Sequence, residues 1–271
     1  DFMKEKMEYF KIRPIPDALF ALYIDAYHTH IKEDNQSTPV SLFVAVGIDL
    51  SGYKSIYGFW VLKGKENVSL WNEIFQDMIS RGLSRVLILV TDHFSGIEKL
   101  VQRLLPLSDH QFCLVHLYRN LKNKLNLKSM KEIYKLFQAI KNAQNYEEGQ
   151  KYYKELVDKV KEINPSYAKY LEKYESNYLA FLKYPSTSKK IHIYHKHSGI
   201  CKFWLRVYEK QARFRGILVG FFNSLKTLEI NAFIQFANLH DKWLDKPNPV
   251  IASESYKLRQ LFALRFDISD E

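Results

Sequence analysis

The chain has 271 residues, 46% of them hydrophobic, so it can bury a core as one large domain or two smaller ones. Its 40 Lys and Arg outnumber 30 Asp and Glu, and the formal charge of +10 favours a polyanionic partner, with Lys-rich solvated helix faces as the alternative explanation. Two cysteines without a paired spacing argue against a disulfide framework and favour a reducing, cytoplasmic setting, and no apolar run is long enough to span a membrane.

The N-terminal part of the chain predicts a helix followed by three strands. Residues 2–11 carry an amphipathic helical pattern, and residues 18–24 form a first strand that ends at Asp25. The polar residues 33–39 are typical of a turn, after which residues 40–48 and 56–62 form two further strands. Short connections between successive strands predict an antiparallel meander.

The next segment predicts β-α-β elements. Residues 69–81 have helical apolar spacing, with Gly82 as the stop, and residues 85–90 form a buried strand that leads into Asp92. Ser95 is the expected cap of a helix that runs to Leu105, and residues 111–115 form another strand.

Beyond His116 the sequence predicts an all-helical block that is rich in Lys and Tyr and runs to about residue 182, with a helix boundary at Asn164 and Pro165. Its tyrosines have irregular helical spacing, so we expect most to pack against neighbouring helices rather than stack on bases; they are Tyr146, Tyr152, Tyr153, Tyr167, Tyr170, Tyr174 and Tyr178. Residues 221–240 are expected to form the last amphipathic helix.

Asp25 and Asp92 are the candidate catalytic residues. Both are expected at the ends of neighbouring strands of a mixed sheet in a basic chain, and carboxylate oxygens suit Mg²⁺ in phosphodiester chemistry. The alternative for either aspartate taken alone is a turn or cap residue.

A set of motifs extends through nearly the whole chain. The most specific is Thr91-Asp92 with Gly96-Ile97, followed by Cys113-Leu114-Val115-His116. The others lie at residues 10–14, 23–26, 46–48, 58–60, 181–185 and 221–226 and in the helix that contains Trp71. In this combination the chain resembles the Mutator-type transposases of bacterial and archaeal insertion sequences.

The resemblance implies a ribonuclease-H-like α/β fold: a mixed sheet with an all-helical insertion before the last catalytic acid. The core would comprise residues 1–116 and 191–271, and the insertion residues 117–190. The implied partner is DNA, at the element ends and the target, with no membrane contact and with a homo-oligomer assembled on the DNA. An N-terminal DNA-binding portion is expected to precede the residues printed here.

The resemblance also implies an Asp-Asp-Glu site that binds Mg²⁺ or Mn²⁺ and cuts and transfers DNA strands. Asp25 would be the first acid and Asp92 the second, and both would bind the metal. His116 would hydrogen-bond near the active site or to DNA. Cys113 is expected to be a buried strand residue rather than a zinc ligand, because a structural zinc site needs four ligands.

The third catalytic acid is missing from the sequence. Where the family reads Thr-Thr-Asn-x-x-Glu, this chain has residues 193–201, with Gly199 near the position of the acid. Cys201 is a soft ligand that suits Mg²⁺ poorly, and Glu209 lies about three helical turns further on. We therefore expect strand transfer to be much reduced or absent.

A frame disruption in the gene is one explanation for this loss. Possible codons for residues 194–200, read one base later, can encode Thr-Thr-Asn-x-x-Glu, so we favour a shift near Tyr194 that is reversed before Gly220 over ordinary divergence. The gene's nucleotides test this. Two other interpretations are a noncatalytic DNA-binding remnant that interferes with intact transposase and a poorly folding product with Phe203 and Trp204 in a foreign segment.

Overall fold

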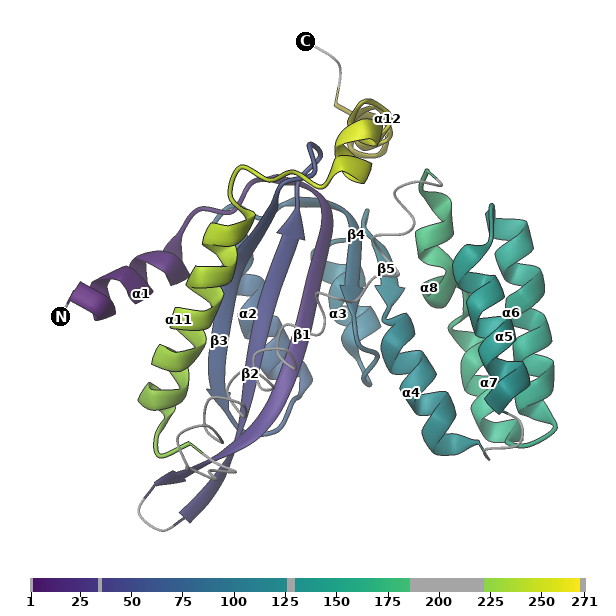
Figure 1. Ribbon diagram of the computed structural model, residues 1–271, viewed down its shortest axis with the longest axis horizontal. Coiled ribbons are helices and arrows are strands. Elements are labelled where there is room, and N and C mark those ends of the chain that lie inside the picture. Colours follow the sequence, from purple (N-terminus) through teal and green to yellow (C-terminus); the bar gives the residue numbers. More distant parts are fainter. Residues whose placement is uncertain (1, 34–35, 126–129, 186–221, 269–271) are drawn as a thin grey trace. The chain divides into compact units, whose positions relative to one another are not determined.

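The computed structural model describes residues 2–33, 36–125, 130–185 and 222–268 and has a mixed α/β architecture (Figure 1). Five strands form one sheet in the order β3-β2-β1-β4-β5. The strands are β1 (Ala18–Glu33), β2 (Gln36–Ile48), β3 (Lys54–Lys63), β4 (Arg85–Thr91) and β5 (Asp109–Phe112). The predicted α/β class is confirmed.

Helices occupy most of the remaining described residues. They are α1 (Phe2–Ile12), α2 (Val68–Ser80), α3 (Ile97–Leu104), α4 (Leu114–Lys124), α5 (Met130–Asn142), α6 (Tyr146–Lys161), α7 (Pro165–Lys173), α8 (Glu175–Leu179), the 3₁₀ turn η1 (Ala180–Lys183), α11 (Leu225–Trp243) and α12 (Pro249–Phe266). In the part of the chain that the structure describes, no helix combines the length and the apolar character needed to cross a membrane.

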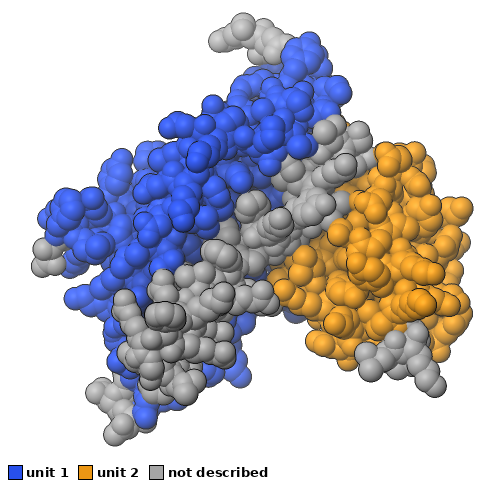
Figure 2. All heavy atoms as spheres, viewed as in Figure 1, with its two compact units in different colours: residues 1–89, 94–108, 196–271 blue, residues 90–93, 109–195 orange. Residues whose placement is uncertain are grey.

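The chain divides into two compact units (Figure 2). Unit 1 comprises residues 1–89, 94–108 and 196–271, and unit 2 comprises residues 90–93 and 109–195. The division into residues 1–116, 117–190 and 191–271 that the sequence suggested stays a prediction.

Backbone hydrogen bonds define the strand directions. β1 pairs antiparallel with β2, and β2 with β3, which confirms the predicted meander. The amide of Arg85, the first residue of β4, donates to the carbonyl of Asp17 just before β1 at 2.8 Å, so these neighbouring strands start together and run in the same direction. Cys113 after β5 donates to Thr91 at the end of β4 at 2.9 Å, which gives β5 that direction too.

The first hairpin is longer than the sequence suggested. β1 and β2 stay paired from Ala21↔Ile48 to Glu33↔Gln36, so the expectation of a turn over residues 33–39 is wrong. The polar composition was misleading because residues 36–39 pair with the end of β1, where Ile31 is fully buried. Pro39 is compatible with a strand here because it lies just beyond the last β2–β3 pair, Val40↔Lys63, so its missing backbone N–H removes no hydrogen bond to β3.

Unit 1 buries both faces of its strands. Phe59 of β3 contacts the rings of Phe10 in α1 and Phe236 in α11, so these helices cover one face. Phe43 of β2 meets Trp71 of α2 edge to face at 5.4 Å, so α2 covers the other face. Since neighbouring residues of a strand alternate between faces, unit 1 is a sheet between two helical layers.

The helix ends in unit 1 agree with the sequence in part. The predicted helices at residues 2–11 and 69–81 are confirmed as α1 and α2, and Gly82 follows α2 with a φ of 113° that suits glycine. Ser95 does not cap α3: Gly96 occupies the N-cap position and no side chain bonds there.

The C-terminal end holds one helix more than we expected. α11 confirms the helix predicted over residues 221–240, but α12 follows it, so α11 is not the last helix. α12 lacks a clear apolar stripe, and its residues Tyr256 and Leu264 are strongly exposed. The local signal was nevertheless present, because Asn248 caps α12 and Pro249 is its first residue.

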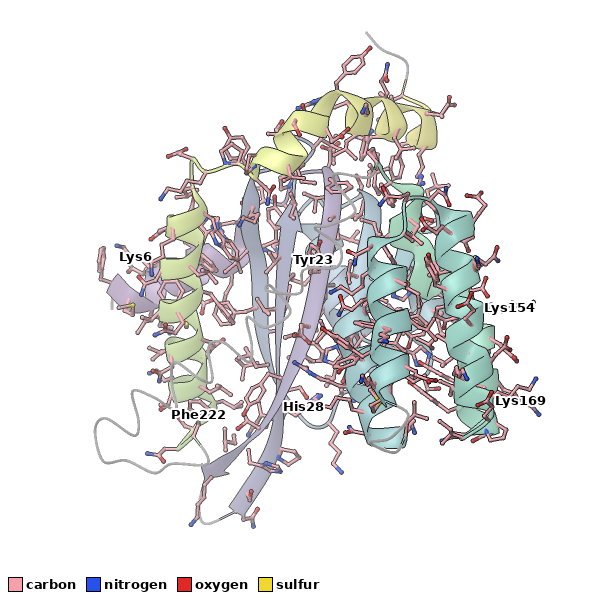
Figure 3. The ribbon with its side chains drawn as sticks, turned by 45° about the vertical axis from the view of Figure 1, so that its right-hand side comes forward. Lys6, Tyr23, His28, Lys154, Lys169 and Phe222 are labelled. Carbon is pink, nitrogen blue, oxygen red and sulfur yellow. The ribbon has the colours of Figure 1, made fainter. Side chains whose placement is uncertain are left out.

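Unit 2 is the helical block that the sequence predicted beyond His116, together with β5. The helix boundary at Asn164 and Pro165 is confirmed, since the Asn164 side chain accepts from the amide of Tyr167 at the start of α7. Lysines such as Lys154 and Lys169 point outward (Figure 3). None of the seven tyrosines is exposed, which confirms that they pack against helices.

Candidate active site

Asp25 lies in unit 1, inside β1 rather than at its end. It pairs with Val44 of β2, and eight further residues of β1 follow it, so the predicted strand end at Asp25 is wrong. The strand continues because the residues after Asp25 pair with the part of β2 that we had interpreted as a turn. The half-buried Asp25 side chain is on the sheet face of Val44 and Phe59, which α1 and α11 cover.

Asp92 lies in unit 2, directly after the end of β4, as the sequence predicted. One carboxylate oxygen, Oδ1, accepts from the amide of His93 at 2.8 Å. The other, Oδ2, is 3.7 Å from Nδ1 of His116, a distance that makes an electrostatic contact rather than a hydrogen bond. The Asp92 side chain is 43% exposed and that of His116 is 18% exposed, so solvent and ligands can reach the carboxylate.

The peptide on each side of Asp92 is firmly held within unit 2. The Thr91 hydroxyl donates to the Asp92 carbonyl at 2.8 Å, so it can only accept from Nε2 of His110 at 2.9 Å. The His93 ring packs among the rings of Phe112, Tyr170 and Tyr174, with centroids 4.5–5.1 Å away. These contacts hold the backbone at Asp92 and thereby set the direction in which its side chain points.

His116 is near Asp92 because of how α4 begins. Cys113 is the N-cap of α4 and its sulfur accepts from the amide of His116 at 3.3 Å, which places His116 in the first turn. Cys113 is buried, as we expected, but it follows β5 instead of lying in it: the strand predicted over residues 111–115 exists, but it ends at Phe112. The partial positive charge of the α4 N-terminus favours an anionic Asp92 nearby.

Tyr167 is a further side chain near Asp92, and no sequence motif pointed to it. Burial, together with Tyr170 and the charge of Asp92, raises the pKa of the Tyr167 hydroxyl. Among the described residues, this buried hydroxyl has no hydrogen-bond partner. Lys124 approaches the face of the same ring, with Nζ 5.2 Å from the centroid.

The described residues contain no group of three or more His, Cys, Asp or Glu side chains that could hold an ion. Asp25 and Asp92 are nevertheless hard oxygen donors, and Mg²⁺ commonly uses one or two carboxylates with water and substrate phosphates. As oxygen donors the two aspartates suit Mg²⁺ or Mn²⁺ rather than a soft metal, and residues 193–201, including Gly199, lie outside the described part of the chain.

Comparison with known proteins identifies the class. The family model for "Transposase, Mutator family" matches residues 1–198, which include Asp25, Asp92 and His116. Because this match covers well over half of the chain, the chain belongs to the Mutator family of transposases. The resemblance inferred from the sequence motifs is confirmed.

Curated relatives agree with this assignment. The chain is 27% identical over 184 residues to the transposase for insertion sequence element IS905 of Lactococcus lactis, an alignment that covers 67% of this chain and 46% of the relative. It is 23% identical over 252 residues to the transposase for IS1081 of Mycobacterium tuberculosis, covering 90% and 57%. The chain thus spans about half the length of the curated relatives it matches.

Proposed function

We propose that this chain is the catalytic region of an insertion-sequence transposase that binds DNA and cuts and joins strands at the ends of its element. The observation that carries the proposal is the Mutator-family match over residues 1–198. A formal charge of +10 supports DNA as the partner, and the cysteine usage supports a cytoplasmic site of action.

The proposal includes a ribonuclease-H-like fold with a helical insertion. The strand order β3-β2-β1-β4-β5, with three antiparallel strands followed by strands that run with β1, supports this assignment. Helices α4 to α8 of unit 2 would be the insertion, because they follow β5 and precede the position of the third acid.

Asp25 and Asp92 are the proposed metal ligands. Each lies seven residues after the first residue of its strand, and β1 and β4 are neighbours that start together. This equal spacing supports a shared role. When bound, a divalent cation stabilises the charge that develops on the phosphate and activates the attacking oxygen. The chain's own part is to hold both carboxylates, with the contact from His116 limiting the rotation of Asp92.

Strand transfer by this copy is proposed to be strongly reduced. The described residues contain no group of three candidate metal ligands, the sequence has no acid at the family's third position, and the family match ends at residue 198, just before Gly199. Fewer acids hold the cation more weakly and orient the attacking oxygen less well.

The test is a cleavage and joining assay on the whole chain. Purified protein is incubated with duplexes that carry the element ends and Mg²⁺ or Mn²⁺, and the products are separated on a denaturing gel. We expect salt-dependent binding with at most trace products. Asp25→Asn and Asp92→Asn should abolish the trace, whereas Asp158→Asn, a change at an exposed position of α6, should not.

Each outcome bears on a different part of the proposal. Absence of DNA binding would contradict the function, and products unaffected by Asp92→Asn would contradict the site. Efficient strand transfer by the unaltered chain would contradict the impairment. Replacing residues 194–200 by the sequence of the shifted frame should restore activity.

A second candidate is a noncatalytic DNA-binding remnant that interferes with intact transposase. The incomplete set of acids combined with a retained charge of +10 favours it. Adding this chain to an active relative should then lower that enzyme's strand transfer, and light scattering on DNA should detect the homo-oligomer proposed to assemble there. Failure to inhibit would contradict this alternative.

A further inference from the structure

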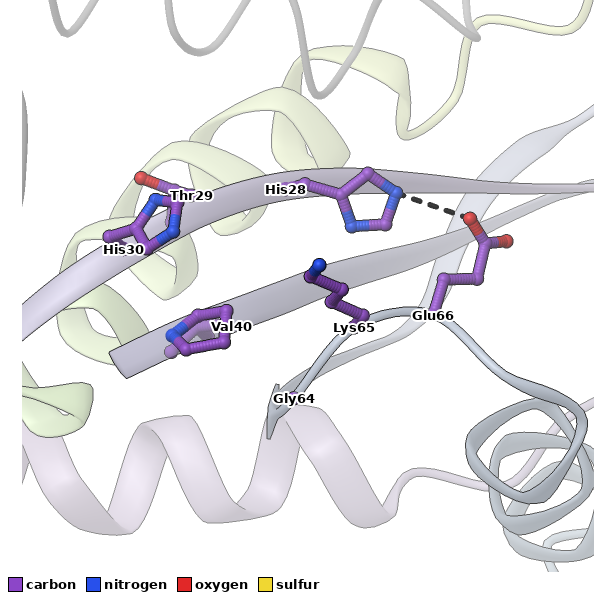
Figure 4. A pocket seen from close by; sticks show the side chains of 8 residues that line it. His28, Thr29, His30, Val40, Gly64, Lys65 and Glu66 are labelled. Atoms are coloured by element: carbon purple, nitrogen blue, oxygen red, sulfur yellow. Dashed lines mark hydrogen bonds and ion pairs between the residues drawn. The ribbon is translucent and has the colours of Figure 1, made fainter. Parts of the chain in front are cut away.

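A hollow of about 360 Å³ opens in unit 1 on the outer half of β1 and β2, beside the segment between β3 and α2 (Figure 4). It is lined by His28, Thr29, His30, Pro39, Val40, Gly64, Lys65 and Glu66. His28 lies three residues after Asp25, so its side chain is on the opposite face of β1. The side chains of His28 and His30 are therefore on the other face of β1 from the proposed metal ligand.

The hollow combines an apolar floor with a basic rim. Pro39, the partner of His30 in the β1–β2 ladder, supplies a flat apolar ring on the same face as His28 and His30. His28, His30 and Lys65 are exposed. A flat apolar floor with cations beside it matches a nucleotide, whose base has apolar faces and whose phosphate is anionic.

The protonation of His28 follows from its hydrogen bonds. The Ser41 hydroxyl donates to the Gly64 carbonyl at 3.0 Å, so Ser41 can only accept from Nδ1 of His28 at 3.1 Å. Nε2 of His28 is 3.1 Å from a Glu66 carboxylate oxygen, which also only accepts. Both ring nitrogens thus face acceptors, an arrangement that favours the cationic form of His28 beside Glu66.

This charge state removes the obstacle that Glu66 presents to an anion. One Glu66 oxygen faces His28 and the other accepts from the indole of Trp71 at 2.7 Å, so the carboxylate is neutralised and held. Lys65 therefore gives the hollow a net positive charge. The Ser41–His28–Glu66 series is not a hydrolytic triad, because Ser41 is fully buried and its hydrogen is used by Gly64.

We propose that this hollow binds one nucleotide of a DNA strand, with the base against the ring of Pro39 and the phosphate at Lys65 and His30. This inference rests on the proposed function, because it takes DNA as the partner. It assigns the outer half of the β1–β2 hairpin as a DNA contact in addition to the acids.

Fluorescence anisotropy with labelled single-stranded and duplex oligonucleotides tests the proposal on the whole chain. Lys65→Gln should weaken binding about fivefold and reduce the salt dependence by about one released ion, as expected for one lost phosphate contact. Lys99→Gln removes an exposed lysine of α3 in the same unit and is the matched control. Thermal unfolding of each variant shows that it is folded.

A charge-rescue pair separates recognition from structure. His28→Gln leaves the Glu66 carboxylate uncompensated and should weaken DNA binding by a similar factor. Adding Glu66→Gln removes that negative charge and should restore most of the affinity, whereas damage to the fold would not be reversed by a second loss of a polar contact.

The outcomes distinguish this inference from the proposed function. If the unaltered chain binds no DNA, the proposed function fails with it. If it binds DNA but Lys65→Gln and His28→Gln behave like Lys99→Gln, only the hollow is refuted. Chemical cross-links from Lys65 to another copy of the chain, unaffected by DNA, would assign the hollow to a protein contact and also overturn the inference.

Discussion

Gln111 of β5 should be one of the most stabilising polar side chains of unit 2. It is 1% exposed; its amide nitrogen donates to the carbonyls of Phe112 and Tyr178 at 2.7 and 3.0 Å, and its oxygen accepts from the amide of Phe181 at 2.9 Å. Gln111→Leu keeps much of the volume but leaves the Tyr178 carbonyl and the Phe181 amide buried without this partner. At about 1–3 kcal/mol for each group, the free energy of unfolding should fall by about 3 kcal/mol.

Urea unfolding followed by far-ultraviolet circular dichroism measures this loss, and hydrogen exchange locates it. The amide of Phe181 should exchange on the order of a hundredfold faster in the variant, since each 1.4 kcal/mol is about tenfold. Gln150→Leu is the control, because Gln150 is exposed and, among the described residues, its side chain hydrogen-bonds only to the carboxylate of Glu175. A loss for Gln111→Leu no larger than that of Gln150→Leu would refute the reasoning.

Three further predictions concern buried hydroxyls, a histidine pKa and backbone strain. Tyr167→Phe removes a buried hydroxyl that has no partner among the described residues, so it should raise the free energy of unfolding by about 1 kcal/mol. Tyr153→Phe should lower the free energy of unfolding by about as much, because the Tyr153 hydroxyl donates to the carbonyl of Leu171 at 2.9 Å. Burial, reinforced by the neighbouring Arg13, lowers the pKa of His240 below its usual 6.5. Below pH 6.5 the unfolded chain therefore binds more protons than the folded chain, and the melting temperature should fall as the pH drops. His240→Gln should flatten this pH dependence. Gly82→Ala should cost about 2–4 kcal/mol, because φ is 113° and a Cβ would lie 2.7 Å from a carbonyl oxygen, whereas Gly64→Ala meets no atom within 4 Å and should cost only about 1 kcal/mol.

Denaturant and thermal melts check these three predictions. Equal effects of the two tyrosine changes would contradict the hydrogen-bond argument. An unchanged pH dependence in His240→Gln would assign the titration to other groups. Equal costs at the two glycines would show that backbone strain, and not the close contact, decides the effect at Gly82.

Much of the fold was predictable because the core elements carry strong local patterns. β4 is a continuous apolar run that is buried along its length, and α2 has a clear apolar stripe ended by Gly82. The outer part of β1 and β2 was not predictable in this way, because its polar residues become a strand only through pairing with each other. α12 was missed because its exposed apolar residues obscure any periodic pattern.

The candidate site was predictable only where a motif carried it. The sequence predicted both Asp92, as an acid at a strand end, and His116, in the Cys-x-x-His motif. The two side chains are neighbours because α4 begins directly after Cys113 and carries His116 in its first turn. No such signal exists for the series Ser41, His28 and Glu66, whose members are far apart in sequence and meet through strand register. Their chemistry depends on which residues face one another, and that is a property of the folded sheet.

The isolated bridge between Ile31 and Phe222 has a consequence for how the gene can change. Phe222 donates to the carbonyl of His30 at 3.2 Å and accepts from the amide of Lys32 at 2.8 Å, and α11 begins three residues later. Both bonds use backbone atoms of residue 222, which any amino acid except proline supplies. Insertions, deletions or a temporary change of reading frame upstream can therefore alter the number and kind of residues before Phe222 while α11 still starts from the same anchoring point on β1.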